Sequence, residues 1–142
     1  MDSSAQLFRL LQEIKRVSKH YHNLTGRPLG VTGEVAEYEA ARLMGLELAD
    51  VRQVGYDATR TSGGRRERIQ IKGRCLLPGR GRNPRISRIN VEGEWDTLMV
   101  VVLDGALEPV AIFEAERPDV IAKLSEPGSK ARNERHTLAL SQ

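Results

Sequence analysis

The sequence predicts an α/β or α+β fold in which helices pack on a β-sheet. Three observations predict it. Apolar residues recur at helical spacing near the N-terminus, two central segments alternate polar and apolar residues, and a continuous apolar run follows them. The 142 residues fit one domain, because domains usually hold about 100–150 residues. Within residues 1–142 we expect an N-terminal helix over 1–24 and the core of the domain over 30–142.

The first two predicted elements are helices. Ser3 or Ser4 can cap a helix that runs to about His20. Its apolar stripe comprises Leu7, Leu10, Leu11, Ile14 and Val17. We expect this stripe to pack on the domain, and a dimer contact is the alternative use. Thr32 can cap a second helix that ends near Gly45, because glycine readily takes the left-handed conformation found after helices.

The middle of the chain predicts strands. Residues 51–61 and 65–75 each alternate polar and apolar residues, which is typical of a strand with one buried face. Residues 62–64, Ser-Gly-Gly, predict the hairpin turn between them. Residues 96–103 predict a central strand covered on both faces, and residues 109–114 a further strand.

The remaining segments predict a loop, a helix and a short strand. Residues 77–85 are rich in Gly, Pro, Asn and Arg, which indicates an exposed loop. Pro118 suits the first turn of a helix that runs to about Leu124. Residues 136–140 predict a last short strand, and Trp95 is expected to be a packing anchor.

The hairpin has a predicted register. If Gly63 and Gly64 are its central turn residues, Asp57 lies opposite Gln70. The face expected on the core carries Val54, Tyr56, Ala58, Ile69, Ile71 and Gly73. The face expected to be exposed carries Gly55, Asp57, Thr59, Arg68, Gln70 and Lys72. Opposed Cβ atoms lie about 4.5–5.5 Å apart, so Asp57 and Gln70 oxygens can reach one cation at the magnesium bond length of about 2.0–2.1 Å.

The second helix supplies further carboxylates. Glu37 borders its apolar stripe, and we expect it to point at the sheet. Glu34 shares that face and is a secondary candidate, although an acid in the first turn also simply favours the helix dipole. Glu39 is expected to form a surface ion pair with Arg42.

Positive charge is concentrated in residues 58–91. The segment holds ten basic side chains and one acid on a chain whose net charge is +3. The basic residues are Arg60, Arg65, Arg66, Arg68, Lys72, Arg74, Arg80, Arg82, Arg85 and Arg88. Such a block predicts a polyanionic partner, nucleic acid above all, and a solvated arginine-rich loop is the alternative. Because no aromatic residue interrupts the block, contact with a duplex backbone is favoured over base stacking.

Membrane and secreted classes are not expected. The longest apolar run, residues 98–103, is far shorter than the roughly 20 residues of a membrane helix. The N-terminus lacks a basic start followed by an apolar stretch, which disfavours a secretory signal. Cys75 is the single cysteine, so an internal disulfide is impossible, and we expect a cytoplasmic protein.

Three short motifs together resemble a known superfamily. They are Glu37, then Gly55-Tyr56-Asp57-Ala58, then Ile69-Gln70-Ile71-Lys72-Gly73-Arg74. Across about residues 30–103 the chain resembles the restriction-endonuclease-like superfamily, the PD-(D/E)xK nucleases. Its Q-x-K form is similar to that of Mrr-type nucleases, and the helix start at residues 33–37 is similar to that of junction-resolving members. The resemblance implies a mixed four- to five-stranded sheet flanked by helices in αβββαβ order, here with an extra N-terminal helix.

The resemblance also implies a Mg²⁺-dependent DNA endonuclease that hydrolyses phosphodiesters, with Mn²⁺ able to substitute. Asp57, the Gln70 side-chain oxygen and the Ile71 carbonyl would be metal ligands. Lys72 would orient or deprotonate the attacking water, and Glu37 would hold a metal-bound water or a second metal. The arginines of the basic block would bind DNA, and cleavage of both strands implies a homodimer.

Two positions depart from the superfamily pattern. Tyr56 stands where proline is often found, and Gln70 replaces an acid. Because a neutral ligand binds magnesium more weakly, a non-catalytic DNA- or RNA-binding module on the same fold is one alternative function. An arginine-rich protein-interaction domain is the other.

Overall fold

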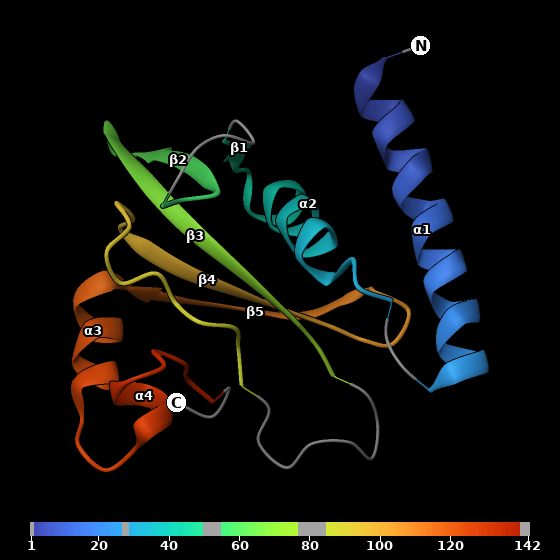
Figure 1. Ribbon diagram of the computed structural model, residues 1–142. Coiled ribbons are helices and arrows are strands. Elements are labelled where there is room, and N and C mark those ends of the chain that lie inside the picture. The colour runs from blue at the N-terminus through green and yellow to red at the C-terminus, as the bar shows by residue number, and fades with distance from the viewer. Residues whose placement is uncertain (1, 27–28, 50–54, 77–84, 140–142) are drawn as a thin grey trace.

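The protein has an α+β fold with a five-stranded mixed sheet flanked by helices (Figure 1). The computed structural model describes residues 2–26, 29–49, 55–76 and 85–139. The elements are α1 (Ser3–Thr25), α2 (Thr32–Met44), β1 (Glu47–Leu48), β2 (Ala58–Ser62), β3 (Arg65–Cys75), β4 (Thr97–Leu103), β5 (Pro109–Glu116), α3 (Arg117–Ser125) and α4 (Lys130–Asn133). The predicted helices and most of the predicted strands are present, and β1 and α4 are additional.

The strands lie in the order β1-β2-β3-β4-β5. All neighbours are antiparallel except β3 and β4, which are parallel. A parallel pair needs a crossover connection, usually a helix. Here residues 76–96 form it, and residues 85–96, the part of it that the structure describes after β3 ends, contain no helix. The helix expected between the third and fourth strands from the superfamily order is therefore not seen in that part.

The hairpin turn confirms the predicted register. Gly63 and Gly64 have φ values of 60° and 79°, which a two-residue hairpin turn of this hand requires and glycine adopts without strain. Ala58 pairs with Ile69, and the ladder continues to the turn with the same offset. The strand predicted over 51–61 instead begins at Ala58, and residues 50–54, including Val54, lie outside the described part of the chain.

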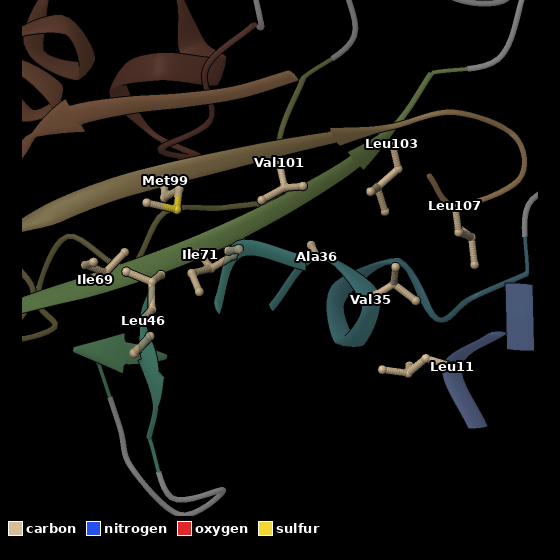
Figure 2. Close-up of a cluster of buried hydrophobic side chains, with 12 residues drawn as sticks. Leu11, Val35, Ala36, Leu46, Ile69, Ile71, Met99, Val101, Leu103 and Leu107 are labelled. Atoms are coloured by element: carbon tan, nitrogen blue, oxygen red, sulfur yellow. The ribbon is translucent and has the colours of Figure 1, made fainter. Parts of the chain in front are cut away.

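One face of the sheet packs against α2. The buried side chains of this first cluster come from both layers: Leu11, Val35, Ala36, Ala40, Leu46, Ala58, Ile69, Ile71, Met99, Val101, Leu103 and Leu107 (Figure 2). Gly73 permits the contact, because a Cβ there would lie 2.6 Å from the Ala36 Cβ and 3.0 Å from the Thr32 carbonyl oxygen. The absence of a side chain at this point lets helix and strand approach closely.

The opposite face is covered as well, which confirms the prediction for residues 96–103 and corrects the expectation that the hairpin residues on this face are exposed. Residues 85–95 and the C-terminal helices lie over it (Figure 1). This second cluster comprises Ile86, Ile89, Trp95, Leu98, Val100, Val102, Val120, Leu124 and Leu138. Tyr56 packs here, not on the α2 face as predicted. Trp95 is buried, which confirms it as an anchor, and the predicted strand over 136–140 is reduced in its described part to one bridge, between Ala139 and Arg85.

The N-terminal helix meets the domain through one side only. Leu11 is buried there, whereas Leu7, Leu10 and Val17 are exposed, so the prediction that the whole stripe packs on the domain is wrong. Among the described residues, no helix combines the length and the apolar character needed to cross a bilayer.

A buried ion pair joins the two N-terminal helices. The Lys15 Nζ lies 2.7 Å from Glu39 Oε1, and Arg42 lies 2.6 Å from the other carboxylate oxygen. Burial raises the pKa of Glu39, but the hydrogen bonds from Lys15 and Arg42 outweigh this and hold the pKa below its ordinary value. The predicted Glu39–Arg42 pair is present, but Glu39 is buried, not on the surface, and it also links α1 and α2.

Candidate active site

Asp57 is held against β3 at the end of a ladder. Its backbone N–H donates to the Ile69 carbonyl at 2.8 Å, and its Oδ2 accepts from the Ile71 N–H at 2.8 Å. The regular pairing begins one residue later, at Ala58, so Asp57 contacts β3 through one backbone hydrogen bond and its carboxylate and is not paired with Gln70 in the ladder as predicted. The carboxylate is thus fixed beside the segment 70–72.

Gln70 is buried on the face that carries the second cluster. Its side chain is 6% exposed, and Oε1 accepts no hydrogen bond from any described residue. An unpaired buried polar atom is destabilising by about 1–3 kcal/mol. Such an oxygen needs a donor or a cation, and this fits the role of a metal ligand. The prediction that Gln70 lies on an exposed face is wrong.

Lys72 follows on the same face as Gln70. It is half-buried, and its Nζ donates to the Arg88 carbonyl at 2.8 Å. Burial lowers the pKa of Lys72, and the nearby charge of Asp57 opposes this shift only in part. The amine therefore loses its proton at a lower pH than an exposed lysine does.

Glu37 approaches from α2, over the other face of the sheet. It is half-buried, and burial raises its pKa, followed by the charges of Asp57 and Glu34. Asp57 thus links these groups electrostatically, although Glu37 and Lys72 belong to opposite faces of the sheet, and Glu34 lies on the exposed first turn of α2.

The predicted ligand residues carry oxygens that suit a hard cation. Magnesium prefers carboxylate, amide and carbonyl oxygens, and Asp57, Glu37, Gln70 and Ile71 carry these groups. In the part of the chain that the structure describes, three or more His, Cys, Asp or Glu residues nowhere gather into a metal-binding group. A cation at this site would therefore depend on the amide oxygen of Gln70 as well as on the acids.

Some arginines of the basic block are engaged within the protein. Arg60 contacts Glu114 at 2.8 Å and Glu67 at 3.1 Å. The hydrogen bond from Arg68 lowers the pKa of Asp96, whose carboxylate lies 3.2 Å from the guanidinium. Arg85 donates to the Thr137 carbonyl and hydroxyl, at 2.6 Å and 3.0 Å. These three side chains already form hydrogen bonds or ion pairs within the protein.

Other arginines of the block face solvent. Those with exposed side chains are Arg65, Arg66, Arg74 and Arg88. Arg80 and Arg82 lie outside the described residues. The exposed set is the part of the predicted DNA-binding surface that the structure leaves available for phosphates.

The sequence did not predict the contacts that hold residues 55 and 56, directly before Asp57, in position. A Cβ on Gly55 would lie 2.8 Å from the Glu94 backbone nitrogen, so two backbone segments touch there. Arg117 holds the same loop by donating to the carbonyls of Val91, Gly93 and Trp95, and it stacks 4.8 Å above the Trp95 ring. Gly55, two residues before the candidate ligand Asp57, was the available signal for this close approach.

Comparisons with known protein families and with curated protein sequences find no match to this chain.

Proposed function

We propose that this protein is a metal-dependent phosphodiesterase that cleaves DNA. The observation that carries the proposal is the position of Asp57, fixed by the Ile71 N–H and electrostatically coupled to Glu37 and Lys72. The buried Gln70 oxygen without a donor supports it. The α+β fold with a mixed sheet and the motif resemblance to PD-(D/E)xK nucleases point the same way.

Each site residue has a chemical role in this proposal. Asp57, the Gln70 side-chain oxygen and the Ile71 carbonyl would hold Mg²⁺ or Mn²⁺, and Glu37 would hold a water or a second cation. When bound, the cation supplies a Lewis acid and lowers the pKa of water. Lys72 orients or deprotonates the attacking water. Its lowered pKa favours the neutral amine that can accept a proton.

DNA binding would use the exposed arginines. Guanidinium groups bind phosphates through paired hydrogen bonds, so this contact does not depend on base sequence. Arg88 carries its side chain next to the backbone carbonyl that accepts from Lys72, which brings a phosphate-binding group close to the site. Cleavage of both strands would require two sites and hence two copies of the chain.

A binding module without catalysis is the second candidate. The Lys72 amine already has a partner in the Arg88 carbonyl, and among the described residues no three His, Cys, Asp or Glu side chains group into a metal site. A module of this kind would bind DNA with the strong salt dependence of phosphate contacts and would leave it intact.

Plasmid cleavage with Mg²⁺ or Mn²⁺ separates the two candidates. We expect wild-type protein to nick or linearise the plasmid, and Asp57→Asn and Lys72→Met to abolish this. Asp119→Asn and Lys130→Met are matched controls on exposed positions of α3 and α4 and should cleave like wild type. Activity that persists in both site variants overturns the proposal. Salt-sensitive binding without cleavage under either metal supports the binding module.

A further inference from the structure

The outer side of α1 carries an apolar stripe that the domain does not cover. Its exposed members are between 39% and 76% exposed: Leu7, Leu10, Val17, Tyr21 and Leu24. The helix contacts its own domain through Leu11, Lys15 and Ser18. Val17 precedes Ser18 by one residue, which is about 100° around a helix, so the covered and uncovered sides are adjacent. Figure 1 shows α1 at the edge of the molecule, with no other described helix or strand beyond it.

The stripe has the spacing of a helix-pairing seam. Residues 7, 10, 14, 17, 21 and 24 follow one another in steps of three and four, the heptad pattern by which one helix packs on another. Ile14, in the middle, is partly buried against the first cluster. The stripe covers 18 residues, or roughly 27 Å of helix.

We infer that a second copy of this chain covers the stripe, with the two α1 helices antiparallel. A two-fold dimer needs a surface that complements itself. Antiparallel pairing achieves this across the whole stripe: Leu7 meets Leu24 of the second copy, Leu10 meets Tyr21, and Ile14 meets Val17. Every layer is apolar, and the pattern is symmetric about its centre.

The helix dipoles favour the antiparallel direction. Antiparallel dipoles attract each other, whereas parallel ones repel.

The inference stands on the surface of α1 and does not require the nuclease activity. It supplies the interface that a two-site enzyme would need. Because its readout is molecular mass, a negative result here and a negative cleavage result are distinguishable.

Solution mass tests the interface. We expect sedimentation velocity and light scattering to give a dimer for wild type and a monomer for the double variant Leu10→Glu, Val17→Glu. Phe8→Glu is the matched control. Phe8 lies on α1 outside the stripe with a similar exposed fraction, 49% against 54% for Leu10, and its variant should stay dimeric. Far-ultraviolet circular dichroism checks that the variants fold. A monomeric wild type, or a double variant that stays dimeric, overturns the inference.

Disulfide trapping tests the direction. In a Cys75→Ser background, Leu10→Cys with Tyr21→Cys should give an interchain disulfide, and Leu10→Cys alone should not. Positions 10 and 21 of one helix are about 16 Å apart, too far for a disulfide within one chain. Cross-linking by Leu10→Cys alone indicates parallel helices, and that outcome overturns the antiparallel register.

Discussion

The Asp57 carboxylate accepts the Ile71 backbone N–H at 2.8 Å, where the β2–β3 ladder has ended. The N–H would otherwise be an unpaired donor, because β3 pairs with β4 at this point but has no partner strand on its β2 side. One acid therefore completes the hydrogen bonding of β3 on this side and also acts electrostatically on Lys72. Its structural and chemical roles can be separated by substitution.

Asp57→Asn should preserve stability and abolish cleavage, because an amide oxygen still accepts from the Ile71 N–H but carries no charge. Asp57→Ala should also lose activity and in addition lower the free energy of unfolding by about 1–3 kcal/mol, since a backbone donor loses its partner. Chemical denaturation of both variants measures the difference. Equal stability of the two variants would show that the hydrogen bond contributes nothing.

Glu37→Gln should stabilise the protein at neutral pH while removing activity. Burial raises the pKa of Glu37, so the folded state holds its proton at a pH where the unfolded state has lost it. Its contribution to stability therefore falls as pH rises from the ordinary glutamate value through the raised value. We expect a gain of about 0.5–1 kcal/mol in the free energy of unfolding at neutral pH, a size typical of relieving strain at a functional site.

The gain from Glu37→Gln should shrink as the pH falls below the ordinary glutamate range, because Glu37 is then neutral in both states. Denaturant melts across this range test the sign. Glu34→Gln, on the exposed first turn of α2, is the control and should not stabilise. A loss of stability in Glu37→Gln at neutral pH would contradict the prediction.

Gln70→Glu should make folding depend on a divalent cation. The new carboxylate would be buried where Gln70 is 6% exposed, so the variant should be less stable than wild type without metal. Mg²⁺ or Mn²⁺ should raise its melting temperature more than that of wild type, because binding to the folded state alone stabilises it. Thermal melts with and without each metal measure this. If Mg²⁺ or Mn²⁺ raises the melting temperature of a protein that carries both Gln70→Glu and Asp57→Asn by the same amount, the cation does not bind at Asp57.

Gly73→Ala should destabilise the protein by about 1–3 kcal/mol, because the added methyl would meet the Ala36 Cβ at 2.6 Å and force α2 away from β3. Gly33→Ala is the matched control. A Cβ there meets nothing within 4 Å, so alanine should raise stability by about 0.5–1 kcal/mol through its better helix propensity. Urea midpoints of the two variants should therefore move in opposite directions.

Local patterns predicted the hairpin, the helix that ends at Gly45 and the apolar strand β4 because each depends on residues close in sequence. The burial of Glu39 could not be predicted in this way. Its partner Lys15 lies 24 residues earlier, and only the packing of α1 on α2 brings them together.

The sequence predicted which residues form the candidate site but not their burial or their hydrogen-bond partners. Alternation placed Gln70 and Lys72 on one face, yet it could not show that residues 85–95 cover that face, since Ile86, Ile89 and Trp95 follow no regular period. The partner of Lys72 is the backbone carbonyl of Arg88. Because every residue has such a carbonyl, the sequence does not show which one accepts the hydrogen bond.

Trp95 is the one tryptophan of the chain, and its ring is buried beneath Arg117 on the side of the sheet away from α2. Its intrinsic fluorescence therefore reports only on the layer formed by the crossover segment and the C-terminal helices. Circular dichroism is dominated instead by α1 and α2, the two longest helices. Superimposable melting curves from the two signals would mean that both layers unfold together in one cooperative transition. If the fluorescence changes at a lower temperature than the circular dichroism, the layer that covers Lys72 unfolds first.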